Sequence, residues 1–162
     1  MLAVQILEIK NFMHTLFKTD AFAHFLLTEA TIVNGVTYNI DGHITRYDSD
    51  STDDHPYEYM PFGTLKPKVY ELIKGARTPQ YLKFVFTLTP ENTTNTLQSI
   101  SSSTDTSELS GLYINITFKS GKLMATTGVS YKVFKKDTSL EQEWDRLVRL
   151  FFQKNNVYFE SM

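Results

Sequence analysis

Two histidines and one carboxylate occur where they could share one side of a β-hairpin. Asp41 and His43 lie two residues apart on one expected strand, and the expected register places Thr28 opposite Asp41, with His24 close by. Such a group binds a divalent transition metal or holds a general base. His24, Asp41 and His43 are therefore the candidate ligands of a small metal-dependent hydrolase. These residue types are also ordinary on a solvated hairpin face, and the chain has no H-E-x-x-H motif.

An acidic segment follows this hairpin. Its carboxylates are Asp48, Asp50, Asp53, Asp54 and Glu58. Clustered carboxylate oxygens are the ligands that Ca²⁺ and Mg²⁺ prefer. The spacing fails as a calcium loop because Asp53 stands where a glycine is needed and Tyr59 occupies the twelfth position. We expect a solvated loop here.

Five positive charges gather within eighteen residues in the middle of the chain, with aromatic residues between them. This basic patch comprises Lys66, Lys68, Lys74, Arg77 and Lys83, interleaved with Tyr70 and Tyr81. Basic residues mixed with aromatics suit single-stranded nucleic acid or an acidic protein partner, although the same charges could simply solvate a helix and a loop. Lys10, His14 and Lys18 form a second, weaker basic stripe that is typical of any surface helix.

Motifs for common enzyme chemistry are missing from the sequence. It contains no phosphate-binding loop, no G-x-G-x-x-G and no G-x-S-x-G, so we expect no cofactor. The carboxylates Glu141, Glu143 and Asp145 lie near Arg146 and Arg149, which indicates local ion pairs on a helix. The sequence therefore favours a non-enzymatic binding or interaction module.

Length and composition fit one domain that folds on its own core. The chain has 162 residues, of which 41% are hydrophobic and 21% charged, with a net charge of -2 and no cysteine. This charge gives no global attraction to nucleic acid or membranes, so polyanion binding would need a local patch. The first residues lack the apolar core of a signal peptide, and no apolar run is long enough to span a bilayer. We expect a cytoplasmic protein that does not bind membranes and that could oligomerise.

The first part of the chain predicts a strand, a helix and a hairpin. These elements are a strand over residues 2–8, a helix over 9–19 and the hairpin over 25–44. Asn34-Gly35 at the hairpin turn tolerates the two positive φ angles of a type I′ turn. A two-residue turn there would place Thr31 opposite Tyr38.

The second part predicts alternating strands and helices after a loop at 47–63. These elements are a helix over 65–73, a strand over 81–89, a helix over 90–99, strands over 112–119 and 122–127, a bend or bulge at Gly128 before a strand over 129–134, a helix over 138–153 and a short C-terminal strand. Thr138 and Glu141 form a capping-box pattern before the last helix. The pattern predicts an α+β fold with one or two mostly antiparallel sheets and three to four helices. Its expected core includes Phe84, Phe86, Ile114, Ile116 and Trp144.

Three segments of the chain resemble an uncharacterised protein family of anaerobic gut Clostridia. They read FLLTEATIVNGVTYNIDGHI, ELIKGARTPQYLKFVFTLTPENT and GKLMATTGVSYKVFKKDTSLEQEWDRLVRLF. The family is a domain of unknown function without an assigned catalytic motif, so the resemblance implies a bacterial stand-alone domain and no particular activity.

The order of elements also resembles that of a DNA sliding clamp domain. Residues 1–46 and 81–135 both read as a strand, a helix and further strands, and a clamp domain contains two such units. The resemblance implies helices that line a basic channel. The expected helix over 90–99 carries no Lys or Arg, which departs from the clamp pattern.

Overall fold

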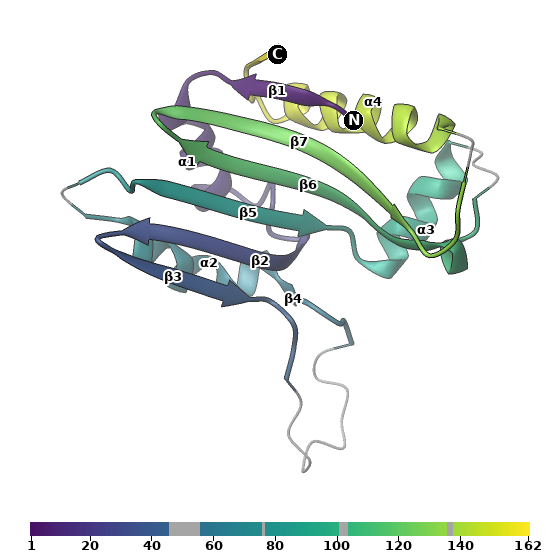
Figure 1. Cartoon of the computed structure of the whole chain (residues 1–162), viewed down its shortest axis with the longest axis horizontal. Helices are drawn as coiled ribbons and strands as arrows, with labels where there is room; N and C mark the ends of the chain where they lie inside the picture. The colour runs from purple at the N-terminus through teal and green to yellow at the C-terminus, as the bar shows by residue number, and fades with distance from the viewer. Residues whose placement is uncertain (46–55, 76, 101–103, 136–137) are drawn as a thin grey trace.

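The computed structural model describes residues 1–45, 56–75, 77–100, 104–135 and 138–162 (Figure 1). It is an α+β fold built on one antiparallel sheet, as the sequence predicts. The elements are β1 (Ala3–Ile6), α1 (Ile9–Lys18), β2 (Leu26–Asn34), β3 (Val36–Asp41), β4 (Met60–Pro61), α2 (Phe62–Ile73), β5 (Tyr81–Thr87), α3 (Pro90–Ser99), the 3-10 turn η1 (Thr106–Glu108), β6 (Leu109–Lys119), β7 (Lys122–Tyr131), α4 (Ser139–Lys154) and β8 (Phe159–Ser161). Among the described residues, no helix is long and apolar enough to cross a membrane.

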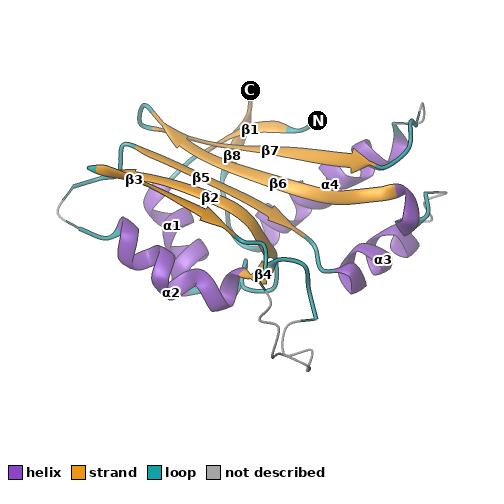
Figure 2. Cartoon of the chain, turned by 60° about the horizontal axis from the view of Figure 1, so that its bottom comes forward, coloured by secondary structure: helices purple, strands orange, loops and turns teal. Residues whose placement is uncertain are grey.

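The strands lie in the order β3-β2-β5-β6-β7-β1-β8, and β4 pairs with β2 beside this path. Side chains on the central strands alternate between buried and partly exposed, for example along β5, where Leu82, Phe84 and Phe86 are buried. Figure 2 shows α1, α2 and α4 on one face of the sheet, with the other face left open. The buried strand residues form one core cluster with buried residues of these helices, so they belong to the helix side. We call this uncovered side the open face.

The core is rich in phenylalanine. Phe22 contacts Phe12, Phe25, Phe86 and Phe151 with ring centroids 5.2–5.8 Å apart. All five residues that the sequence assigns to the core are buried, and their exposed fractions do not exceed 5%. Each such side chain contributes about 1.5–3 kcal/mol by leaving water.

The first hairpin has a different register from the one predicted. Thr31 pairs with Asn39, one residue away from the predicted partner Tyr38. The prediction of a type I′ turn is wrong because only Gly35 has a positive φ, of 78°. Asn34 stays in the strand, where its side-chain amide donates to the carbonyl of Leu72 at 3.2 Å.

The type I′ geometry occurs instead at the second hairpin, between β6 and β7. Ser120 and Gly121 have φ values of 53° and 76°, as this turn requires. The bulge predicted at Gly128 is wrong, because Gly128 pairs regularly with Tyr113 and β7 continues past it to Tyr131. The irregularity lies on the partner strand, at the start of β6.

Among the described residues, α1, α3 and α4 lie within one residue of their predicted bounds, whereas α2 begins three residues earlier than predicted. Of the two predicted N-caps, one is formed. Thr89 caps α3 as predicted, because its hydroxyl accepts from the Asn92 N–H at 3.2 Å. Helix α2 begins earlier than predicted because the N–H of buried Phe62 donates to the Phe25 carbonyl at 2.8 Å. The predicted capping box of α4 is not formed, since Thr138 has φ -100° and ψ 10°, which is not the extended backbone of a side-chain cap.

The two similar halves of the chain do not form separate units in the sheet. Their elements read β1-α1-β2-β3 and β5-α3-β6-β7, but β1 leaves its own half and lies between β7 and β8. The N-terminus is held there, because the Leu2 N–H donates to the Thr127 hydroxyl at 2.9 Å and the terminal amine lies 3.5 Å from Asp145.

Candidate functional site

A short two-stranded ribbon extends from the end of β3 and carries Tyr59. His43 bridges to Tyr59, the Ile44 N–H donates to the Glu58 carbonyl at 2.9 Å, and the Met60 N–H donates to the Gly42 carbonyl at 2.9 Å. The ribbon begins against β2, where a Cβ added at Gly42 would lie 1.7 Å from the Leu27 carbonyl oxygen. Only glycine therefore allows this close approach, which positions Glu58 and Tyr59 beside the sheet.

Tyr113 projects from β6 on the open face, toward the end of the sheet that carries Tyr59. A Cβ at Gly111 would lie 2.8 Å from the ring carbon Cζ of Tyr113, so the glycine leaves room for this ring. The backbone carbonyl of Tyr113 accepts from the indole N–H of buried Trp144 at 3.0 Å. Trp144 thus holds β6 from the helix side of the sheet, while the phenol ring of Tyr113 lies on the open face.

Tyr59 and Tyr113 together line two adjoining cavities, which we call the tyrosine cleft. The first has a volume of about 250 Å³ and the second about 620 Å³. The first is lined by Leu26, Glu58, Tyr59, Thr87, Leu88, Pro90, Thr93, Thr94, Thr106, Leu109, Ser110, Gly111 and Tyr113. The second is lined by Thr28, Glu29, Ala30, Thr31, Asn39, Ile40, Asp41, Tyr59 and Tyr113.

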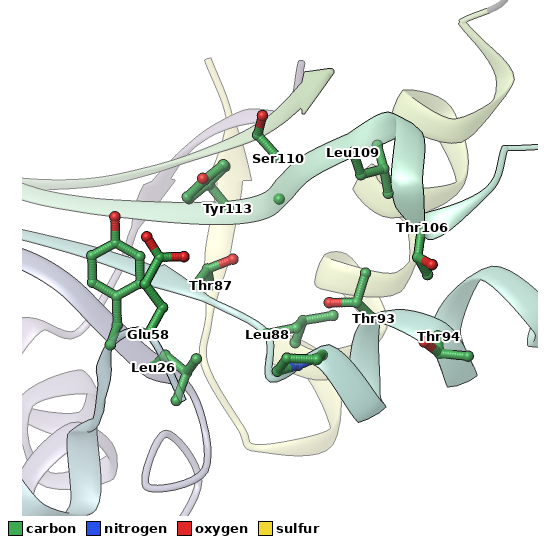
Figure 3. A pocket seen from close by; sticks show the side chains of 13 residues that line it. Leu26, Glu58, Thr87, Leu88, Thr93, Thr94, Thr106, Leu109, Ser110 and Tyr113 are labelled. Atoms are coloured by element: carbon green, nitrogen blue, oxygen red, sulfur yellow. The ribbon is translucent and has the colours of Figure 1, made fainter. Parts of the chain in front are cut away.

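The first cavity of the tyrosine cleft lies where β5 passes into α3 (Figure 3). Glu58 and Tyr113 lie toward one end of it, and Thr93, Thr94 and Thr106 lie toward the other (Figure 3). The hydroxyl of Thr93 donates to the Thr89 carbonyl at 2.9 Å, which fixes the Thr93 side chain in the first turn of α3. The cavity therefore combines aliphatic walls with hydroxyl groups and one carboxylate.

The electrostatics of the cleft favour neutral tyrosines beside carboxylates. Burial raises the pKa of Tyr113, and the nearby Tyr59 and Glu58 raise it further. Burial also raises the pKa of Tyr59, and the nearby charges of Glu58 and Asp41 raise it further. No Lys, Arg or His is among the described residues that line the two cavities. The cleft is therefore complementary to a ligand that carries positive charge.

The predicted metal ligands line separate cavities. Asp41 and His43 remain adjacent, since the carboxylate of Asp41 accepts from the backbone N–H of His43 at 2.9 Å, and His43 Nε2 lies 3.9 Å from Glu58. His24 instead lines a cavity with Thr89 and other residues around the start of α3. Within the described parts of the chain, no three His, Cys, Asp or Glu side chains are grouped to hold a metal ion.

The basic patch predicted from the sequence is divided between the two faces of the sheet. Lys83 alternates with buried residues on β5 and pairs with Glu29 at 2.8 Å, so Lys83 and Tyr81 belong to the open face. Lys66 lies on α2, on the helix side, and donates to the Thr19 carbonyl at 2.9 Å. Lys68 lies on α2 with its side chain exposed.

The remaining two cations of the patch lie near the C-terminal end of α2. Lys74 pairs with Glu71 at 2.8 Å, and this hydrogen bond raises the pKa of Lys74. Lys74 and Arg77 line a groove together with Lys10 of α1. Of the acidic segment, Asp48, Asp50, Asp53 and Asp54 lie outside the described residues, whereas Glu58 lines the tyrosine cleft.

Sequence reasoning singles out Asp41 and Glu58 but misses both tyrosines of the cleft. The available signal is Gly111, because a glycine inside a strand marks a place where another group approaches the backbone closely. Tyr113 follows it by two residues and therefore lies on the same face of β6. Tyr59 could not be found this way, because its position depends on how the ribbon folds back on β2.

Comparisons with known proteins place the chain in a family without assigning an activity. No curated protein and no solved structure matches it, so the resemblance to a sliding clamp receives no support. A family model, described as a family of unknown function (DUF5721), matches residues 15–160, so the chain belongs to this family.

Proposed function

We propose that the chain is a non-enzymatic binding module whose tyrosine cleft holds a small organic cation. One observation carries this proposal: Tyr59 and Tyr113 both line each of the two adjoining cavities, and a carboxylate lines each cavity as well, Glu58 the first and Asp41 the second. Aromatic faces attract cations through their negative π-surface, by about 0.5–2 kcal/mol per contact. The carboxylates add charge attraction at the same place.

Charge around the cleft supports this class of ligand. Glu29 also lines the second cavity, but Lys83 neutralises it at 2.8 Å. Among the described residues, neither Glu58 nor Asp41 pairs with a Lys or an Arg: His43 Nε2 lies 3.9 Å from Glu58, and the His43 backbone N–H donates to Asp41 at 2.9 Å. An anionic ligand would meet these carboxylates without a lining cation, so the cleft selects against it.

The hydroxyl groups of the first cavity fit binding better than catalysis. Thr87 Oγ1 donates to the Leu112 carbonyl at 2.8 Å, and Thr93 Oγ1 donates to Thr89, so neither hydroxyl is bonded to a side-chain base. These groups can still accept hydrogen bonds from a ligand that carries N–H or O–H donors.

Binding of single-stranded nucleic acid stays a prediction from the sequence, with weaker support. A nucleic-acid strand needs cations along one continuous surface. Lys83 and Tyr81 lie on the open face, whereas Lys66 and Lys68 lie on α2 across the sheet.

Choline provides a direct test of cation binding. Titration followed by NMR or calorimetry should show saturable binding of choline to one site. The neutral isostere of choline, with carbon in place of the quaternary nitrogen, should bind at least tenfold more weakly, because it fills the same space without the charge. Glu58→Gln should weaken choline binding about fivefold, and Tyr113→Leu should weaken it by a similar factor.

A matched control separates this effect from a general loss of negative charge. Glu160→Gln removes a carboxylate from β8, at the other edge of the sheet, and should leave choline binding unchanged. Equal affinity for choline and its neutral isostere, or equal losses in Glu58→Gln and Glu160→Gln, would contradict the proposal.

A further inference from the structure

We infer that a second cavity, distinct from the tyrosine cleft, binds an aliphatic carboxylate. This basic groove has a volume of about 390 Å³. It is lined by Ile9, Lys10, Met13, Ile73, Lys74, Gly75, Arg77, Thr78, Pro79, Leu82 and Phe118. It lies where the start of α1, the end of α2 and the end of the sheet at the start of β5 come together.

The groove offers an apolar surface for an alkyl chain. Leu82 and Phe118 are paired residues of β5 and β6 on the helix side of the sheet, and Ile73 ends α2 beside them. Ile9 and Met13 of α1 are one turn apart and only partly buried, although both pack against the core. Since the groove volume falls in the range of small-molecule sites, an alkyl chain can occupy it and remove this apolar surface from water.

The positive charges of the groove determine which end group a bound ligand must carry on its alkyl chain. Lys74 is already paired with Glu71 at 2.8 Å. Among the described residues, Lys10 and Arg77 have no ion-pair partner, and both side chains are exposed. Two unpaired cations beside an apolar surface complement a carboxylate with an aliphatic tail.

Other ligand classes match the groove less well. Inorganic phosphate would meet the cations but leave the apolar lining in water. An alkyl amine would cover the lining but place a positive charge beside Lys10 and Arg77. A saturated carboxylic acid of medium length satisfies both parts of the groove at once.

Decanoate below its micelle concentration is the probe for this site. Isothermal titration with the full chain should show one saturable site, and decylamine should bind at least tenfold more weakly. Within the series from hexanoate to decanoate, each added methylene should tighten binding by about fourfold while the chain still lies in the groove.

Charge-reversal variants identify where decanoate binds. Lys10→Glu combined with Arg77→Glu should weaken decanoate binding more than tenfold. Lys18→Glu combined with Lys68→Glu makes the same charge change on α1 and α2 outside the lining of the groove and should leave affinity unchanged. Met13→Gln replaces an apolar lining residue by a polar one of similar length and should reduce the gain from each methylene. Circular dichroism and thermal unfolding confirm that each variant is folded.

Three outcomes would overturn the inference. The first is equal binding of decanoate and decylamine. The second is an equal loss of decanoate binding in the two double variants. The third is binding that fails to saturate at one equivalent, which would show general surfactant adsorption. None of these outcomes bears on choline binding, because the tyrosine cleft shares no lining residue with the groove.

Discussion

The tyrosine cleft and the basic groove lie at opposite ends of the same pair of strands but have opposite charge. The cleft includes Thr87 at the end of β5, whereas the groove includes Leu82 near its beginning, about 17 Å away along the strand. Carboxylates and phenols surround the first, and Lys and Arg surround the second. The net charge of -2 therefore says little about what this chain can bind, because the fold places carboxylates around one cavity and Lys and Arg around the other, at opposite ends of the strands.

The largest effect should come from Gly42→Ala, which changes the tyrosine cleft but not the basic groove. The added Cβ would lie 1.7 Å from the carbonyl oxygen of Leu27, a buried residue that cannot move freely. The ribbon must shift away from β2 and carry Tyr59 with it. We expect the free energy of unfolding in urea to fall by about 3 kcal/mol, with choline binding lost and decanoate binding retained in the folded fraction.

The matched control for this variant is Gly75→Ala, at the basic groove. A Cβ there meets no atom within 4 Å, so stability and choline binding should not change. A Gly42→Ala protein as stable as the Gly75→Ala protein would show that the ribbon does not depend on this contact.

A smaller effect is expected from Gly111→Ala, because the group in the way is a side chain. Its Cβ would lie 2.8–3.0 Å from the ring of Tyr113, which must swing into the cleft. Choline affinity should fall about fivefold, while the free energy of unfolding changes by less than about 1 kcal/mol. In Gly128→Ala the nearest atom of Tyr113 would be 3.9 Å away, so choline affinity should stay the same. If both variants bind choline normally, the ring position does not matter for the ligand.

Combining variants of the two regions tests whether they act independently. Choline binding should not respond to Lys10→Glu with Arg77→Glu, and decanoate binding should not respond to Glu58→Gln. Because the regions are about 17 Å apart, the changes in binding free energy should add to within about 0.5 kcal/mol. Calorimetric titration of the combined variant with each ligand measures this, and a larger coupling would mean that the sheet transmits binding from one end to the other.

The smallest effect should be seen in the pH dependence of stability. Burial raises the pKa of Tyr113 in the folded chain above its ordinary value of 10.0. The unfolded chain therefore loses this proton first, so stability is full below pH 10 and falls as pH rises through the unfolded value toward the folded pKa. Urea unfolding between pH 9 and 11 should show a shallower fall for Tyr113→Phe than for the wild type. Identical profiles for the two proteins would show that Tyr113 does not contribute.

The sequence predicts the elements better than it predicts how they meet. Strand alternation and helical spacing correctly place β5, α1 and α4 and identify Trp144 as a core residue. The hairpin register is missed because Asn34 is held by the Leu72 carbonyl, which lies in a distant helix. The basic patch looks continuous along the chain, but Lys83 points to the open face because strand residues alternate sides. Proximity in sequence therefore does not establish a shared surface here.

The position of β1 constrains the order in which the chain can fold during synthesis. All four of its residues pair with β7, and three of them, Val4 to Ile6, also pair with β8. A ribosome adds about 5–20 residues per second, so the first strand waits several seconds for its partners to be made. Until then its buried side chains and its unpaired backbone are exposed to other nascent chains and to chaperones. The sheet is completed only after β8 has been made, when β1 comes to lie between β7 and β8.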